Sequence, residues 1–173
     1  MLDLIRNRRS ARKFDGRPIP TELIDLLGES LLRSPTSKNN RPWEFIFVDD
    51  PTLLAHLAVC KPHGATFLKE APLAVVIVAD EKASDVWVED CSIAAITLQY
   101  VAQSLDLGSC WIQVRKRFHD SGDSAEAVVR RTLEIPDHFR VASIVALGYR
   151  REERTGVPKE KLDYQKIKLN RYS

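Results

Sequence analysis

The chain has 173 residues, of which 44% are hydrophobic and 29% are charged, a composition typical of a single globular domain with one sizeable core. Its 26 lysines and arginines nearly balance its 24 aspartates and glutamates, whereas proteins committed to a nucleic-acid backbone usually carry a broader positive excess. The longest strongly apolar stretch, residues 71–79, is far too short to cross a bilayer, and the N-terminus lacks the apolar core of a signal peptide, so we expect a cytoplasmic protein that binds neither nucleic acid nor membrane.

Three helices and one strand are predicted in the first third of the chain. Hydrophobic spacing predicts helices at about 2–9 and about 20–33, and a Ser-Pro pair ends the second. After a polar loop, residues 43–49 are rich in aromatic and β-branched side chains and predict a strand. Residues 51–59 begin with proline, a common first residue of helices, and predict a short helix.

The middle of the chain is expected to hold a buried strand followed by a buried helix. Residues 73–80 are a continuous apolar run, which predicts a strand covered on both faces. From Cys91 to Leu107 the side chains are apolar on nearly every face of a helix, and Gly108 is expected to end it. Because one small sheet cannot cover so many apolar faces, this helix also predicts an interface with a second chain.

Two more strands, at 109–114 and 141–149, flank a further helix. The pair Asp123 and Glu126 has the spacing of a capping box and predicts where that helix begins. Four strands interleaved with helices predict an α/β or α+β domain built in layers. The tail at 150–173 is polar and basic with scattered apolar residues, so it is expected to lie on another surface.

The segment RNRRSARKF, residues 6–14, places five cations and one hydroxyl in nine positions. A solvated basic face, a targeting segment or a nucleic-acid arm would each explain such a cluster. Arg8 and Arg12 are four residues apart and would share one face of a helix, with the Ser10 hydroxyl nearby. Guanidinium groups match phosphate oxygens two at a time and a hydroxyl donates to another, so the cluster also suits a phosphate monoester.

Other patterns that carry chemistry are absent from the sequence. It has no G-x-S-x-G elbow, no G-x-x-x-x-G-K-[ST] phosphate loop and no G-x-G pair, which argues against a Rossmann dinucleotide site. Three cysteines without a C-x-x-C pair, Cys60, Cys91 and Cys110, are expected to be reduced core residues. The four histidines lack metal-ligand spacing, so no metal is predicted. We assign no catalytic side chain and expect a cofactor to carry any chemistry.

Five stretches, taken in order, resemble the signature blocks of the nitroreductase family of flavin mononucleotide (FMN) enzymes and span nearly the whole chain. They are RRSARKF, SPTSKNNRPWEFIFV, FLKEAPLAVVIV, DCSIAAITLQYVAQSLDLGSCWI and IPDHFRVASIVALGYRRE. The resemblance implies an α+β fold, a three-layer α/β/α sandwich in which helices flank a mixed, mainly antiparallel sheet. Residues 1–173 would form a single FMN-binding domain, with 150–173 packed on the partner subunit.

The resemblance also implies an anchor for the flavin. The family's R-x-S-x-[RK] pattern, which contacts the flavin phosphate and ring, falls on Arg8, Ser10 and Arg12, with Arg9 inside it. The family's late basic pair falls on Lys159 and Lys161, which are therefore candidate phosphate ligands.

A loop and a strand complete the implied site. The family's P-S-x-x-N-x-Q-P-W loop covers the flavin from the other subunit, and here Arg41 replaces its usual glutamine. The strand whose backbone N–H faces flavin N5 corresponds to residues 109–114. The implied contacts are Pro35, Thr36, Ser37 and Asn39 in the loop, and Ile112 and Gln113 in the strand.

The resemblance further implies an FMN-dependent oxidoreductase that takes hydride from NAD(P)H, a transient co-substrate, and passes it to a nitroaromatic, quinone or similar small acceptor by a ping-pong mechanism. An anchor in one chain and a covering loop in the other imply a homodimer with composite active sites. Two alternatives stay open: a flavoprotein of the same fold with a dehalogenase-like or flavin-processing reaction, and a non-catalytic basic module that binds nucleic acid.

Overall fold

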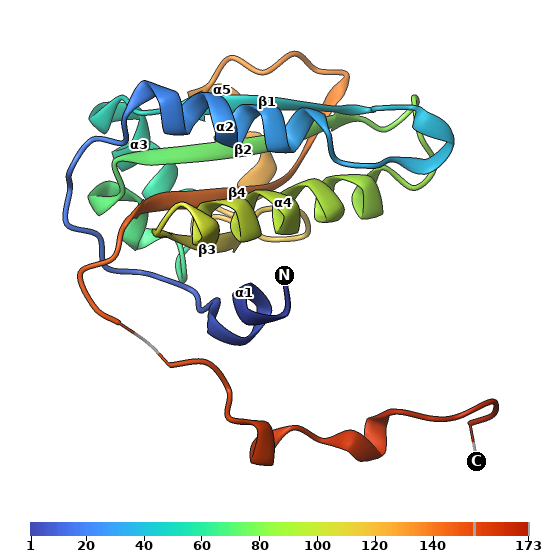
Figure 1. Ribbon diagram of the computed structural model, residues 1–173. Helices are drawn as coiled ribbons and strands as arrows, with labels where there is room; N and C mark the ends of the chain where they lie inside the picture. The colour runs from blue at the N-terminus through green and yellow to red at the C-terminus, as the bar shows by residue number, and fades with distance from the viewer. Residues whose placement is uncertain (154, 173) are drawn as a thin grey trace.

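The computed structural model describes residues 1–153 and 155–172. Its sheet has four strands, and Figure 1 shows helices on both faces of that sheet. The strands run in the order β1-β2-β4-β3, and every neighbouring pair is antiparallel. Among the described residues, one parallel pairing occurs, an isolated bridge between Ser10 and Ser109 of β3. The predicted α+β sandwich is confirmed. The strands are β1 (Trp43–Val48), β2 (Leu73–Asp80), β3 (Leu107–Gln113) and β4 (Phe139–Tyr149).

Each face of the sheet has its own apolar core. Helices α2 (Thr21–Leu32) and α4 (Trp87–Ser104) cover one face, and α3 (Pro51–Ala58) and α5 (Ala125–Thr132) cover the other. Strand β2 lies between β1 and β4, so its alternate residues supply both cores, which explains its unbroken apolar sequence. No helix in the described ranges is long and apolar enough to span a membrane.

The boundary between α4 and β3 differs from the expectation. The helix begins earlier, at Trp87, and ends at Ser104, and Leu107 already belongs to β3. Asp106, with a φ of 59°, lies in the turn between them. Gly108 is therefore a strand residue and not a helix stop. A Cβ at this position would lie 2.4 Å from Cγ of Arg150, so glycine is required by close packing.

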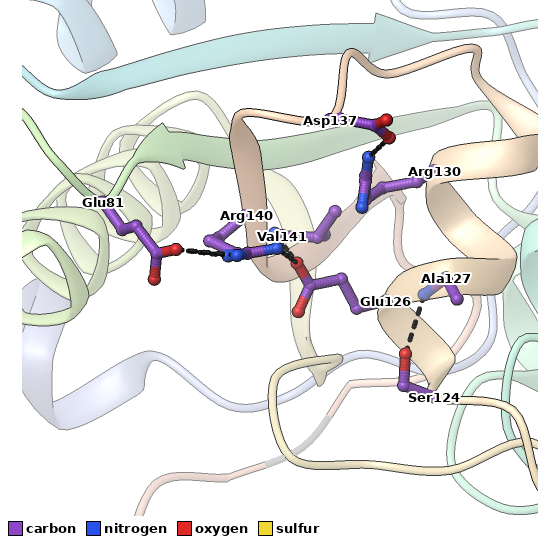
Figure 2. Close-up of polar contacts among 8 residues, drawn as sticks. All are labelled: Glu81, Ser124, Glu126, Ala127, Arg130, Asp137, Arg140 and Val141. Atoms are coloured by element: carbon purple, nitrogen blue, oxygen red, sulfur yellow. Dashed lines mark hydrogen bonds and ion pairs between the residues drawn. The ribbon is translucent and has the colours of Figure 1, made fainter.

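The predicted cap of α5 is wrong by one residue. Ser124 is the N-cap, and its hydroxyl accepts a hydrogen bond of 3.0 Å from the N–H of Ala127 (Figure 2). Asp123 instead forms an ion pair of 2.7 Å with Arg131. The local sequence motif was present, but the backbone register of the helix places a different side chain at its start.

Glu126, the other half of the expected capping box, ties α5 to the sheet. Its Oε1 atom accepts a hydrogen bond of 3.3 Å from the backbone N–H of Val141. Arg140 lies beside it and forms an ion pair of 2.7 Å with Glu81, which follows β2. Figure 2 shows these side chains converging between α5, β4 and the end of β2. This network fixes α5 on the face opposite α4.

After β4 the chain leaves the sheet as an extended tail with two short 3₁₀ turns, Lys159–Lys161 and Tyr164–Lys166. In Figure 1 the tail runs below α1 (Leu2–Asn7), away from both cores. Its described residues are exposed except Arg150, next to β4, and Gly156, where a Cβ would collide with the Arg6 carbonyl. Residues 154 and 173 of the predicted tail lie outside the described residues. Packing of the tail on a partner remains a prediction.

Candidate functional site

The basic segment runs along the outer side of β3. Helix α1 ends at Asn7, Arg8 has extended backbone angles, and the N–H of Ala11 donates to the carbonyl of Ser109 at 2.9 Å. Arg8 and Arg12 therefore do not share a helical face, as their spacing had suggested. They share a side of an extended segment, in which alternate residues point the same way. Ala11 is buried in the α3/α5 core, while its polar neighbours remain outside.

The arginines open onto a cavity of about 990 Å³ between α1 and the tail. Ligand pockets commonly measure about 300–1,000 Å³. Apolar side chains of α1 and of the tail, including Leu2, Ile5 and Leu162, form the rest of its wall. Lys161 lines an adjoining hollow together with Arg9. The predicted anchor residues that line the main cavity are Arg8, Arg9, Ser10, Arg12 and Lys159.

Three of the arginines that line the cavity lack carboxylate partners, whereas a fourth, Arg6, forms an ion pair of 3.1 Å with Asp3. The flanking Lys13 forms an ion pair with Glu152, and Arg17 pairs with Asp15 at 2.7 Å. Within the described residues, Arg8, Arg9 and Arg12 form no ion pair. On a purely solvated basic face, we would not expect the flanking cations to be ion-paired while the cations between them are left without carboxylates. The unpaired charges are available to an anion.

The Cys110 thiol lies close behind this cluster. Burial raises its pKa, and Arg12, the Ser10 hydroxyl, Arg8 and Lys61 act in the opposite direction. Lys61, which does not line the cavity, is thus a further cation within electrostatic reach of this thiol, and sequence reasoning missed it. It follows α3 in a loop with no periodic signal. Burial, together with the nearby Arg117 charge, lowers the pKa of Lys61.

The outer edge of β3 offers backbone groups beside the cluster. Because Ser109 directs its carbonyl toward Ala11 and away from β4, the alternate residues Trp111 and Gln113 also direct their N–H groups outward. Ile112 pairs inward and its side chain is buried in the core. Of the two predicted strand contacts, the geometry therefore favours Gln113. Its side chain is held by Trp111 Nε1 at 3.0 Å and by the carbonyl of Arg115 at 2.9 Å.

The predicted covering loop is not part of this cavity. It lies beside the N-terminal end of α4, where the N–H of Ser37 donates to Asp90, and Figure 1 shows it well away from α1. Thr36 accepts from the N–H of Arg41 at 3.0 Å, and Asn39 accepts from Arg41 Nε at 2.9 Å. Arg41 is thus bonded within the loop. One chain does not bring Pro35, Thr36, Ser37 and Asn39 to the arginines.

The fold and site together define a layered α+β sandwich whose antiparallel sheet has, beside its edge strand β3, a cavity lined by three unpaired arginines. Comparison with known proteins assigns the family. The model of the Nitroreductase family matches residues 5–59 and 54–149, and the chain belongs to the nitroreductase family.

Several relatives resemble the chain over most of its length. A putative NADH dehydrogenase/NAD(P)H nitroreductase of Methanothermobacter thermautotrophicus is 37% identical over 152 residues, which cover 86% of this chain and 76% of the relative. A protein of the same description from Archaeoglobus fulgidus is 34% identical over 157 residues, which cover 88% of this chain and 87% of the relative. The structure of an FMN-dependent nitroreductase from Clostridium difficile R20291 superposes with a TM-score of 0.97 at 42% identity, covering 99% of this chain and 100% of that one.

Proposed function

We propose that the protein is an FMN-dependent oxidoreductase that uses NAD(P)H to reduce a nitroaromatic, quinone or similar small acceptor. The observation that carries this proposal is the group of unpaired guanidinium groups around Ser10 in the cavity. Three cations and a hydroxyl match the charge and the acceptor oxygens of a phosphate monoester. Relatives named NAD(P)H nitroreductase and FMN-dependent nitroreductase support the choice of cofactor and co-substrate.

The anchor residues have separate tasks in this proposal. Arg8, Arg9 and Ser10 hold the phosphate, and Lys159 and Lys161 add charge from the tail. Arg12, at the end of the cluster, provides a fixed positive charge for the electron-rich ring. The N–H of Gln113 on the outer edge of β3 donates to the ring edge.

The covering loop supports a homodimer with composite sites. Pro35, Thr36, Ser37 and Asn39 lie away from the cavity of their own chain, so they serve the cavity of a partner. The exposed apolar residues of the tail, such as Ile167 and Leu169, would be covered in the same assembly. A two-fold pairing gives two equal sites, each with an anchor from one chain and a loop from the other.

Bound FMN supplies the hydride chemistry. The residues of the chain bind the phosphate, orient the ring against β3 and exclude water through the loop. Since no second nucleotide site is assigned, NAD(P)H and the acceptor occupy the same place in turn, which is a ping-pong order. No side-chain acid or base is required, because solvent delivers the proton.

The absorption spectrum of the purified protein tests the cofactor. We expect a flavin spectrum, with FMN identified by mass after denaturation. Under anaerobic conditions NADH or NADPH should bleach it, and a nitroaromatic or quinone should restore it. A colourless protein that cannot be reconstituted with FMN would overturn the proposal. Bound FMN that neither nicotinamide reduces would instead favour a different flavin reaction.

A further inference from the structure

The loop that precedes β1 has an unusual backbone. Three of its residues, Lys38, Asn39 and Arg41, have positive φ angles of 51°, 57° and 48°. Residues with side chains adopt this region infrequently, and several within four positions persist only when surrounding contacts impose them. The hydrogen bonds from Arg41 to Thr36 and Asn39 supply part of that constraint from within the loop.

The remaining constraint comes from a carboxylate on α4. Asp90 is only 2% exposed, and its two oxygens accept different donors. Oδ1 accepts from the N–H of Ser37 at 2.9 Å, and Oδ2 accepts from the Ser84 hydroxyl at 2.9 Å. Asp90 lies in the first turn of α4, where the helix dipole favours a negative charge. The carboxylate thus joins the loop, the segment before α4 and α4 itself.

We propose that Asp90 is a positioning residue, which holds the covering loop of its own chain in the conformation that completes the partner's flavin site. This inference rests on the composite site proposed above. Asp90 lines none of the anchor cavity and acts through the backbone of Ser37. Ser84 assists by fixing the second carboxylate oxygen.

The chain offers graded variants. Asp90→Ala removes both acceptors and frees the loop. Asp90→Asn keeps one carbonyl oxygen for Ser37 and should retain most of the function, and Ser84→Ala leaves the Ser37 contact in place. Glu89→Ala is the matched control, because Glu89 is an exposed acidic residue in the same helical turn. We expect Asp90→Ala to weaken FMN binding at least about tenfold and Glu89→Ala to leave it unchanged.

Heterodimers separate positioning from general destabilisation. Two differently tagged chains are co-expressed, the mixed dimer is purified through both tags, and tightly bound FMN is counted by absorbance. Asp90→Ala paired with Arg12→Ala should hold one FMN per dimer, since the intact anchor of the first meets the intact loop of the second. Asp90→Ala paired with the loop variant Thr36→Ala/Asn39→Ala should hold none, because both loops are damaged.

A further pair distinguishes the two levels of the proposal. Arg12→Ala with Thr36→Ala/Asn39→Ala must hold one FMN per dimer if the sites are composite, and its failure would overturn the composite site together with the role of Asp90. If that pair succeeds, the role of Asp90 alone is overturned by any of three results. These are loss of FMN in the pair with Arg12→Ala, retention in the pair with the loop variant, or an equal effect of Glu89→Ala.

Discussion

The spacing of Arg8, Ser10 and Arg12 does not decide whether a helical or an extended backbone brings them to one side. A separation of four residues fits one face of a helix and also one side of an extended segment, because both periods return to the same direction. The sequence identified the residues, but the hydrogen bond from Ala11 to Ser109 selected the extended form. That bond joins residues almost a hundred positions apart, so no local pattern could reveal it.

Loss of a single anchor arginine should reduce FMN affinity. We expect Arg8→Ala and Arg12→Ala each to raise the dissociation constant about ten- to a hundredfold, since a charge-assisted contact contributes about 1.5–3 kcal/mol. Quenching of flavin fluorescence on titration measures this. Arg33→Ala is the control, because Arg33 pairs with Glu29 on the surface of α2. Anchor variants that bind FMN as tightly as the control would contradict the assignment.

We expect the charged Lys61 side chain to lower the stability of the flavin-free protein and to contribute to FMN binding. Burial and Arg117 lower its pKa, so the charged ammonium is disfavoured in the folded protein without ligand. We expect Lys61→Met to raise the Tm of the flavin-free protein at neutral pH. The same change should raise the dissociation constant of FMN by less than about tenfold, because the Lys61 side chain is still partly solvated. The Tm gain should shrink as pH rises toward the ordinary lysine pKa of about 10.4, because the lowered pKa lets native Lys61 lose its proton before the unfolded chain does. Lys69→Met, an exposed change, should alter neither quantity.

The cysteines should be unreactive until the protein unfolds. All three are buried and free, as expected, and burial raises the pKa of Cys60, Cys110 and Cys91, the last to about 12. We expect a thiol reagent at pH 8 to label none in the native protein and all three in denaturant. Neutral thiols stabilise the fold fully below the ordinary thiol pKa of about 8.5, so stability should fall as pH rises toward 12. Rapid native labelling would contradict this burial.

At the scale of elements, tertiary contacts account for the errors of boundary and cap. Leu105 and Leu107 continue the helical spacing of apolar residues past the polar Gln103, Ser104 and Asp106, so periodicity alone extends the helix to Leu107. What requires Gly108 is the close approach of Arg150, a contact between distant segments. The types and order of the elements followed from local pattern, because long apolar runs and Pro, Gly and Ser signals are properties of neighbouring residues.

The cap of α5 can be tested with adjacent substitutions. Ser124→Ala should lower stability by about 1 kcal/mol, a fall in Tm of about 2–4 °C, because the Ala127 N–H loses its acceptor. Asp123→Ala should have a much smaller effect, since its ion pair with Arg131 is exposed. Thermal denaturation followed by circular dichroism compares the two. A larger loss for Asp123→Ala would restore the original assignment.

At the scale of the whole molecule, sequence reasoning located both halves of the candidate site without placing them relative to each other. The anchor and the loop Pro35, Thr36, Ser37 and Asn39 lie apart in one chain. They would meet only if a second chain were present. The pairing of two chains depends on the complementary shapes of their folded surfaces, which local sequence patterns do not reveal. The same holds for the exposed tail, because its described apolar residues belong to neither apolar core of its own chain.

Removal of the tail should affect assembly more than folding. Among the described residues, a chain that ends at Glu153 loses only exposed ones, apart from Gly156 against α1, so its sheet and helices should form. We expect the dimer to dissociate at concentrations where the full chain stays paired, and FMN to be lost with it. Sedimentation at graded concentrations measures the change. An equally tight dimer of the shortened chain would show that the tail does not contribute to pairing.

The extended segment around Ser10 has a second consequence, for colloidal behaviour. The outer side of β3 carries unpaired N–H and carbonyl groups next to apolar residues, the kind of edge onto which another chain can add a strand. The basic segment occupies the start of this edge and sets a row of like charges beside the rest. A second copy that approached edge to edge would meet its own charge. Trimming or fusing the N-terminus therefore risks precipitation as well as loss of ligand.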